Sequence, residues 1–190
     1  MAGRKLLFYS MRRLKLIFLL FFFFLPVNWA AAQSSVEPLS PVAIADTSKE
    51  DLLTCKDEEL GVRLLCNPDW ELQTDKETIL IIISSDPAVT LTIARQKTPL
   101  ISVEQLSNTL LTELGQYEEG FDTERIHLAG QEAIKVKGFY KSYPQIRLLD
   151  YYLIHNSSLY MVLFSVNPKE KWDDYKFLIK RITESLSFLE

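Results

Sequence analysis

One stretch, from Gln145 to Val166, constrains the fold of this chain more than any other. It consists of two apolar, aromatic-rich runs, QIRLLDYYLI and LYMVLFSV, which are separated by His155-Asn156-Ser157-Ser158. Such runs on either side of a short polar turn predict a β-hairpin. Because both faces of the runs are apolar, the hairpin belongs in the interior of a sheet. We therefore expect it at the centre, with the other strands extending the same sheet and helices covering its faces.

Length and charge bound the domain organisation and the class of partner. A chain of 190 residues, 47% of them hydrophobic, can form one domain core but is too short for two once a targeting segment is removed. From Gln33 onward the chain carries 16 basic and 25 acidic residues, a net charge of −9. Phosphate backbones repel an acidic body of this kind, so we expect no nucleic-acid partner.

The first 32 residues have the layout of a secretory signal peptide. A basic start precedes the unbroken apolar run Leu16–Leu25, and Ala30-Ala31-Ala32 offers a cleavage site before Gln33. The alternative is an uncleaved anchor over residues 14–32, which would bring the chain to a membrane. The apolar run is well short of the roughly 20 residues that span a bilayer, which favours cleavage and export to the periplasm or the extracellular space.

Composition separates a linker from the domain. Residues 33–50 contain two prolines and no aromatic residue, which predicts a flexible linker before a domain at residues 51–190. The domain begins with two short runs, Leu52–Lys56 and Val62–Cys66, around a turn-like acidic cluster that ends in Gly61. This pattern predicts a first hairpin.

The chain's two cysteines, Cys55 and Cys66, fall on the two arms of this first hairpin at similar distances from the turn. Cross-strand Cβ atoms approach to about 4.5–5.5 Å, and export would expose the thiols to an oxidising compartment, so we predict a disulfide. The alternatives are two unpaired core cysteines, or a nucleophile acting with His127 or His155. The sequence disfavours the nucleophile because it places no cationic partner beside a thiolate.

Hydrophobic periodicity predicts further strands and two helices. The strands are expected at Thr78–Ser84, Val89–Ala94, Ile126–Leu128 and Ala133–Tyr140. Ser102 opens a capping box before a helix that ends near Gly120, and Asn167-Pro168 opens a second helix after the central hairpin. Short links between successive strands favour antiparallel pairing. The predicted class is α+β, with two amphipathic helices either on one face of the sheet or one on each.

Three segments carry a family resemblance: GVRLLCNPDW at Gly61–Trp70, AGQEA at Ala129–Ala133 and ITESLSF at Ile182–Phe188. They are similar to segments of the PsbP-like superfamily, which includes exported bacterial proteins, and the resemblance extends over about residues 52–189. It implies an α/β/α sandwich around an antiparallel sheet that serves as a non-enzymatic binding or assembly module. The metal-related role of the photosynthetic members is not carried over, because no residue here matches a metal or docking motif.

The residues capable of chemistry form no recognised catalytic or metal-binding pattern. His127 and His155 lie 28 positions apart, without the spacing of a zinc site. The carboxylates of Asp57-Glu58-Glu59 and of Asp173-Asp174 lack the alternating pattern of a calcium loop. The commonest hydrolase and nucleotide-binding motifs are also missing from the sequence. We therefore expect no cofactor, no metal site and no catalytic residue.

Asp150 is the one residue that stands out, because it is a carboxylate within an apolar strand and shares a face with Leu148 and Tyr152. Burial of such a group would favour its protonated form, as in a catalytic acid. The interpretation that we favour is a half-exposed partner for Lys137 or Arg147 across the sheet.

Together these features favour an exported, non-enzymatic binding or assembly module whose partner is another envelope protein. Two alternatives stay open. One is an envelope hydrolase that uses Asp150 or a cysteine. The other is a carrier of a small ligand or a lipid, with a pocket between the sheet and a helix.

Overall fold

The structure is a computed structural model that describes residues 52–100 and 102–189, with the backbone alone at residues 112–120 and 140. The predicted signal peptide and linker lie outside the described residues. Within the described part of the chain, neither helix has the length and apolar character needed to cross a bilayer.

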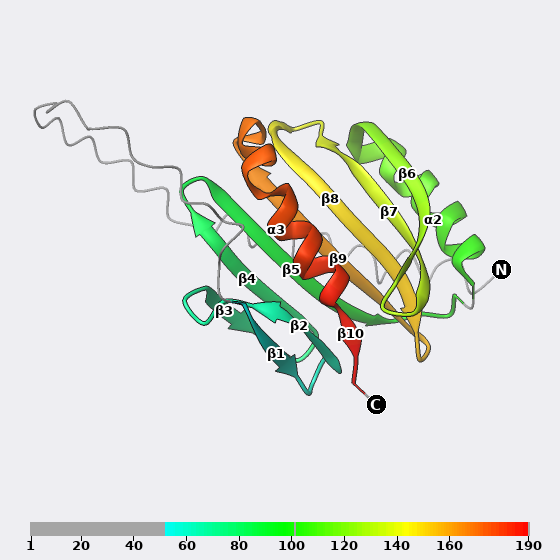
Figure 1. Cartoon of the computed structure of the whole chain (residues 1–190). Coiled ribbons are helices and arrows are strands. Elements are labelled where there is room, and N and C mark those ends of the chain that lie inside the picture. The colour runs from blue at the N-terminus through cyan, green and yellow to red at the C-terminus, as the bar shows by residue number, and fades with distance from the viewer. Residues whose placement is uncertain (1–51, 101, 190) are drawn as a thin grey trace, which may run out of the picture. The chain divides into compact units, whose positions relative to one another are not determined.

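The centre of the domain is a seven-stranded sheet in the order β3-β4-β5-β9-β8-β7-β6 (Figure 1). Every neighbouring pair in it is antiparallel. The strands are β3 (Glu71–Thr74), β4 (Thr78–Ser85), β5 (Ala88–Lys97), β6 (Glu118–Leu128), β7 (Gln131–Tyr140), β8 (Tyr143–His155) and β9 (Ser158–Asn167). The predicted hairpin is β8–β9, and it occupies the interior of the sheet as expected.

The first hairpin does not extend this sheet, so the expectation of a single sheet is wrong. β1 (Leu53–Asp57) and β2 (Val62–Cys66) form a separate three-stranded sheet with the short β10 (Ser187–Phe188). The side chains of β2 alternate, and Val62 and Leu64 join the core cluster that includes α3 and the central strands. Burial of this one face keeps the hairpin over the large sheet instead of at its edge.

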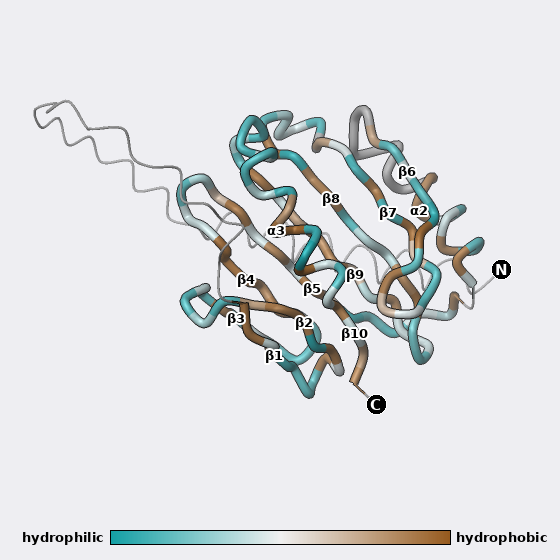
Figure 2. Tube along the Cα trace, viewed as in Figure 1, coloured by the Kyte–Doolittle hydropathy of each residue, from teal (hydrophilic) through white to brown (hydrophobic). Residues whose placement is uncertain are grey.

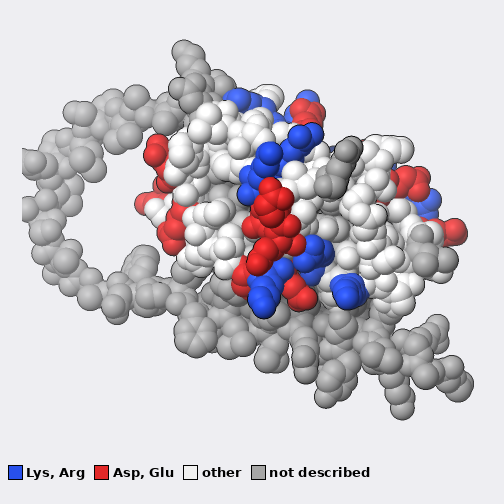
Figure 3. All heavy atoms as spheres, turned by 90° about the horizontal axis from the view of Figure 1, so that it is seen from below, with Lys and Arg blue, Asp and Glu red and all other residues white. Residues whose placement is uncertain are grey.

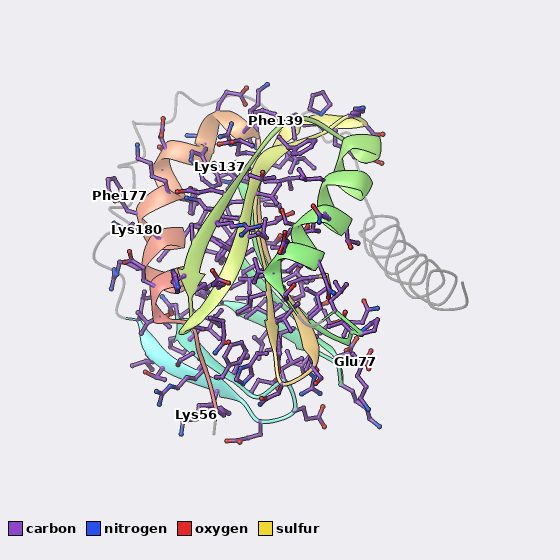
Figure 4. All side chains as sticks on the ribbon, turned by 90° about the vertical axis from the view of Figure 1, so that its right-hand side faces the viewer. Lys56, Glu77, Lys137, Phe139, Phe177 and Lys180 are labelled. Carbon is purple, nitrogen blue, oxygen red and sulfur yellow. A yellow bond between two sulfur atoms is a disulfide. The ribbon has the colours of Figure 1, made fainter. Side chains whose placement is uncertain are left out.

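Two helices lie on opposite sides of the large sheet. α2 (Val103–Tyr117) contacts β6, β7 and β8, whereas α3 (Trp172–Ser185) contacts β9 and β2. The side view in Figure 4 shows the strands between the two helices. The class is therefore α+β as predicted, with one helix on each face, the sandwich that the family resemblance implied.

The two helices begin in different ways. The backbone N–H of Gln105 donates a 3.2 Å hydrogen bond to Oγ of Ser102, so Ser102 caps α2 as predicted. Asn167 does not cap α3: β9 continues through Asn167, a 3-10 turn follows at Lys169–Lys171, and no side chain caps the helix. The predicted start of the second helix is therefore wrong by about a turn.

Apolar side chains fill both faces of the sheet, and Figure 2 shows hydrophobic colour along the strands and hydrophilic colour at the turns. On the α3 face, the central strands contribute Val89, Leu91, Ile93, Leu149, Leu153, Val162 and Phe164. These pack with Leu178, Ile179 and Ile182 of α3. On the α2 face, the helix contributes Val103, Leu106 and Leu110. Burial of apolar area on both faces is the main stabilising term for this arrangement.

The two edge strands differ most from the sequence prediction. β6 runs from Glu118 to Leu128, although only its last three residues were predicted as a strand, and β3 was not predicted. All four residues of β3 are exposed, so it has no apolar alternation to detect. On β6, Glu124 forms a 3.0 Å ion pair with Lys135 of β7, which lowers the pKa of Glu124. Polar edge strands limit edge-to-edge association but give a weak sequence pattern.

A buried hydroxyl links the centre of the sheet to α3. Tyr151 of β8 is 5% exposed and hydrogen-bonds Thr183, whose own hydroxyl donates to the carbonyl of Ile179 at 2.8 Å. Burial raises the pKa of Tyr151, nearby carboxylates raise it further, and the bond to Thr183 opposes the change. The neutral phenol is therefore the form that the folded state favours.

This pKa shift predicts a loss of stability in alkali. The folded pKa of Tyr151 lies above the unfolded value of about 10, so its contribution is complete below about pH 10 and is lost as the pH rises through the folded pKa. In Tyr151→Phe, the free energy of unfolding should fall less steeply between about pH 9 and pH 11. Denaturant titrations at several pH values measure this slope. Tyr143→Phe, at a 40% exposed position, is the matched control, and equal slopes in both variants would refute the assignment.

Candidate functional site

A cavity of about 400 Å³ opens at the tip of the β8–β9 hairpin, on the α3 face of the sheet. Four separate parts of the chain surround it: the β1–β2 turn, the start of β4 together with the adjacent end of β5, the hairpin tip and the C-terminal segment. We call it the tip cavity, and its lining consists of Leu60, Gly61, Glu77, Arg95, Lys97, His155, Asn156, Ser158, Tyr160 and Leu189.

The hairpin turn itself is a tight two-residue connection. Asn156 and Ser157 have φ angles of 47° and 58°, and His155 pairs with Ser158 across the turn. Positive φ at both central residues is the signature of a type I′ turn, whose twist matches that of the flanking strands, and Asn tolerates this conformation well. The backbone therefore fixes where His155 and Ser158 meet the tip cavity.

Three contacts connect the β1–β2 turn and the C-terminal segment to this tip. Tyr160 donates a hydrogen bond from its hydroxyl to the carbonyl of Leu60 at 2.9 Å, and the N–H of Leu189 donates to the carbonyl of Gly61 at 2.9 Å. The ring of His155 stacks on Phe188, with centroids 3.8 Å apart and planes 5° apart. These contacts give the tip cavity a fixed floor and one fixed wall.

Two cations of β5 form a further wall of the tip cavity. Arg95 pairs with Tyr160 and Lys97 with Ser158 in the β5–β9 register, so both side chains lie on the face that carries the cavity. Glu77 lies beside these cations because its backbone carbonyl accepts a 2.8 Å hydrogen bond from the N–H of Arg95. The side chain of Glu77 is exposed. None of the ion pairs found among the described residues includes Arg95 or Lys97.

The surface around this end of the molecule carries no broad field of one sign. Figure 3 looks from below Figure 1 and shows basic and acidic side chains interleaved in a narrow column, with uncharged surface next to it and further charged side chains at the left and right edges. A nucleic-acid backbone is usually bound by a wide basic surface, and the described residues visible in this view form none. The two cations of the tip cavity are thus a local feature.

A second cavity of about 380 Å³ lies near the start of α2 on the other face of the sheet. Its lining includes Ser102, His127, Glu132 and Ile154, and His127 pairs with Glu132 across the β6–β7 turn. The two histidines of the chain therefore belong to different cavities. Across the described residues, no group of three or more potential metal ligands comes together.

The structure places Asp150 away from both cavities. It is 3% exposed, lies on the α2 face opposite Val136 and Leu163, and accepts a 3.3 Å hydrogen bond from the Tyr152 hydroxyl at Oδ2. The interpretation as a half-exposed partner of Lys137 or Arg147 is wrong, because alternation along β7 and β8 puts those two side chains on the opposite face.

The predicted disulfide is present between Cys55 and Cys66, whose Cα atoms are 5.9 Å apart. The register differs from the simple prediction, because Cys55 lies opposite Leu64 and Cys66 lies opposite Leu53. The two cysteines are therefore diagonal neighbours on one face of the hairpin. Within the described part of the chain both cysteines are bonded, so neither alternative for them holds.

A cluster of cationic and aromatic side chains lies far from the tip cavity, near the start of α3. The guanidinium carbon of Arg147 is 4.9 Å from the ring centroid of Phe139 and 5.7 Å from that of Trp172, and Nζ of Lys169 is 5.2 Å from the Phe139 ring. Figure 4 labels Phe139 at one end of the sheet and Glu77 at the other. Such contacts hold the helix start against β7 and β8.

Sequence reasoning did not identify the tip cavity. Arg95 and Lys97 were visible as two cations that follow an apolar strand at a spacing of two, which places them on one face. Nothing in the sequence shows that Leu60 and Leu189 line the same cavity as Arg95 and Lys97, because these residues lie far apart in the chain. The composition of this cavity is a product of the tertiary fold.

The fold is similar to those of two solved proteins. PsbP (CyanoP) from Synechocystis sp. PCC 6803 superimposes with a TM-score of 0.53 at 13% identity, covering 82% of this chain and 98% of that one. LpqN of Mycobacterium tuberculosis gives a TM-score of 0.52 at 15% identity, covering 68% of this chain and 83% of that one. No family model and no curated protein matches the chain. The chain thus has a fold like those of PsbP (CyanoP) and LpqN, in agreement with the resemblance that the three sequence segments indicated.

Proposed function

We propose that this chain is an exported, non-enzymatic binding module of the cell envelope, which binds another envelope protein through the end of the sheet that carries the tip cavity. The observation that supports this most is the tip cavity itself, where two cations without an ion pair among the described residues form one wall of a cavity with a fixed floor. Binding needs such a prepared surface, whereas catalysis also needs a positioned acid, base or nucleophile.

Two further observations agree with export to the envelope. A disulfide persists in oxidising compartments and is rare in the cytosol. LpqN, which shares the fold, is described as involved in cell envelope biogenesis.

The alternative of an envelope hydrolase finds less support. Asp150 is buried beneath α2 and lines neither cavity, and the two cysteines are joined to each other. A carrier of an apolar ligand is also disfavoured, because the cavity beside α2 has a lining that is mostly polar. Binding through the tip cavity needs neither a reactive group nor an apolar pocket.

Site-specific photo-crosslinking in the native envelope tests the proposal. A photoreactive residue at the exposed position of Glu77, on the rim of the tip cavity, should give an adduct with one defined protein. The matched control is Lys141, exposed in the β7–β8 turn. Equal adducts at both positions, or none at Glu77, would contradict the proposal. So would turnover of an ester or phosphoester by the purified domain that is lost in Asp150→Asn.

A further inference from the structure

We propose that the tip cavity is a carboxylate-binding site, into which the partner inserts an acidic side chain or a chain terminus. This inference rests on the proposed function, because it assumes that the end of the sheet with the tip cavity is the binding surface. It adds the chemical class of the group that is recognised. Carboxylate and phosphate are both compact oxyanions, and the experiment below distinguishes binding of one from binding of the other.

The charge of the tip cavity favours an anion. Among the described lining residues, Arg95 and Lys97 supply the positive charge, and Glu77 at the rim supplies the single carboxylate. The ion pairs found among the described residues leave both cations of β5 available. A guanidinium group offers a planar fork of donors that matches the two oxygens of a carboxylate, and a nearby ammonium group adds a second charge-assisted hydrogen bond.

The cationic wall is held in place before a ligand arrives. Arg95 and Lys97 lie at the end of β5, where both residues pair with β9, and the N–H of Arg95 also donates to the carbonyl of Glu77. The imidazole of His155 is fixed by its stack on Phe188 and by the Asn156 amide nitrogen, which lies 3.0 Å from Nε2. Preorganised groups lose less conformational entropy on binding, so each hydrogen bond to the ligand contributes more to affinity.

The floor of the tip cavity strengthens these interactions. Leu60 is fully buried and Tyr160 is 5% exposed, and the Tyr160 hydroxyl already donates to a backbone carbonyl. A carboxylate that enters the cavity therefore meets an apolar floor below and cations at the side. Lower local polarity increases the attraction between opposite charges, which makes the site more selective for a charged group than an open surface would be.

Size and the rim charge limit the ligand further. A volume of about 400 Å³ lies at the small end of ligand pockets, large enough for a side-chain carboxylate and a few carbon atoms. Glu77 at the rim repels additional negative charge. The combination fits one carboxylate with a short apolar stem better than a polyanion.

Titrations of the purified domain, residues 33–190, test this inference with three probes: acetate, inorganic phosphate and a short glutamate-rich peptide. Amide shifts near Lys97 and Ser158 should follow acetate and peptide addition. Arg95→Gln and Lys97→Gln should each weaken binding by about tenfold, as expected for loss of a charge-assisted hydrogen bond. Glu77→Gln should tighten it by a few-fold.

The matched control is Arg125→Gln, which removes an exposed cation of β6 outside the tip cavity and should leave binding unchanged. Thermal unfolding of every variant shows whether it is folded, and the exposed Lys97 serves as the second test if Arg95→Gln does not fold. Binding of phosphate alone would assign the site to phosphate and overturn the carboxylate inference. No binding of any probe, or equal loss in Arg125→Gln, would overturn the site altogether.

Failure of the carboxylate inference can be distinguished from failure of the proposed function. If Glu77 photo-crosslinks one envelope protein but Arg95→Gln and Lys97→Gln together leave that adduct intact, the proposed function stands and the carboxylate inference fails. If the probes bind the tip cavity but no adduct forms at Glu77 in the envelope, the carboxylate site stands and the proposal of an envelope protein as partner fails.

Discussion

Replacing Phe164 by alanine is expected to lower the free energy of unfolding by about 3–5 kcal/mol. Phe164 is fully buried on β9, between Leu91 of β5 and Leu149 of β8 in the register, and it meets the ring of Tyr151 edge to face at 6.5 Å. The substitution removes a large apolar side chain and leaves a cavity that neighbours on three central strands cannot fill. Denaturant unfolding, analysed with a constant slope, measures the change.

Phe177→Ala is the matched control, because Phe177 lies on the outer surface of α3 and is 66% exposed (Figure 4). Loss of an exposed aromatic side chain should change the free energy of unfolding by no more than about 0.5 kcal/mol. If the two substitutions had equal effects, the central position of the hairpin in the core would be wrong.

Removal of the Cys55–Cys66 disulfide is expected to lower the free energy of unfolding by about 2–3 kcal/mol on the chain-entropy description. The crosslink closes a loop with a sequence separation of 11, so it restricts the unfolded chain only modestly. Its effect should nevertheless reach the whole domain, because β2 packs with α3 and the central strands in one core cluster. The denaturation midpoint with and without a reductant measures the loss.

The double variant Cys55→Ala with Cys66→Ala provides the control, since its midpoint should match that of the reduced protein and should not respond to reductant. Intact mass should differ by two hydrogens between the oxidised and reduced forms. A midpoint that is insensitive to reductant in the native sequence would contradict a stabilising role for the bond.

Local patterns predicted the elements that are buried on at least one face. The hairpin of β8 and β9, the strands β4, β5 and β7, and both helices were read from apolar periodicity, and Ser102 was read as a cap from its own chemistry. These features depend on residues a few positions apart, so the sequence contains them directly.

The sequence prediction missed β3 and most of β6 and misplaced the start of α3, each for a physical reason. β3 and most of β6 are edge strands, which solvent reaches, so no apolar alternation marks them. The start of α3 was misplaced because Asn167-Pro168 is a common helix opening, whereas pairing with Ala88 keeps Asn167 in β9. At the start of α3, strand pairing therefore outweighs a local preference, whereas the edge strands carry no local pattern to detect.

The sequence by itself determined that this chain has an α+β core centred on one apolar hairpin and that two cysteines close the first hairpin. Only the tertiary structure decided that the first hairpin lies over the large sheet, that Asp150 faces α2, and that Arg95, Lys97 and His155 meet Leu60 and Leu189 in one cavity. The reason is that burial periodicity is a local property of the chain. Strand pairing and cavities arise between residues that are distant in sequence, and a single sequence does not record those distances.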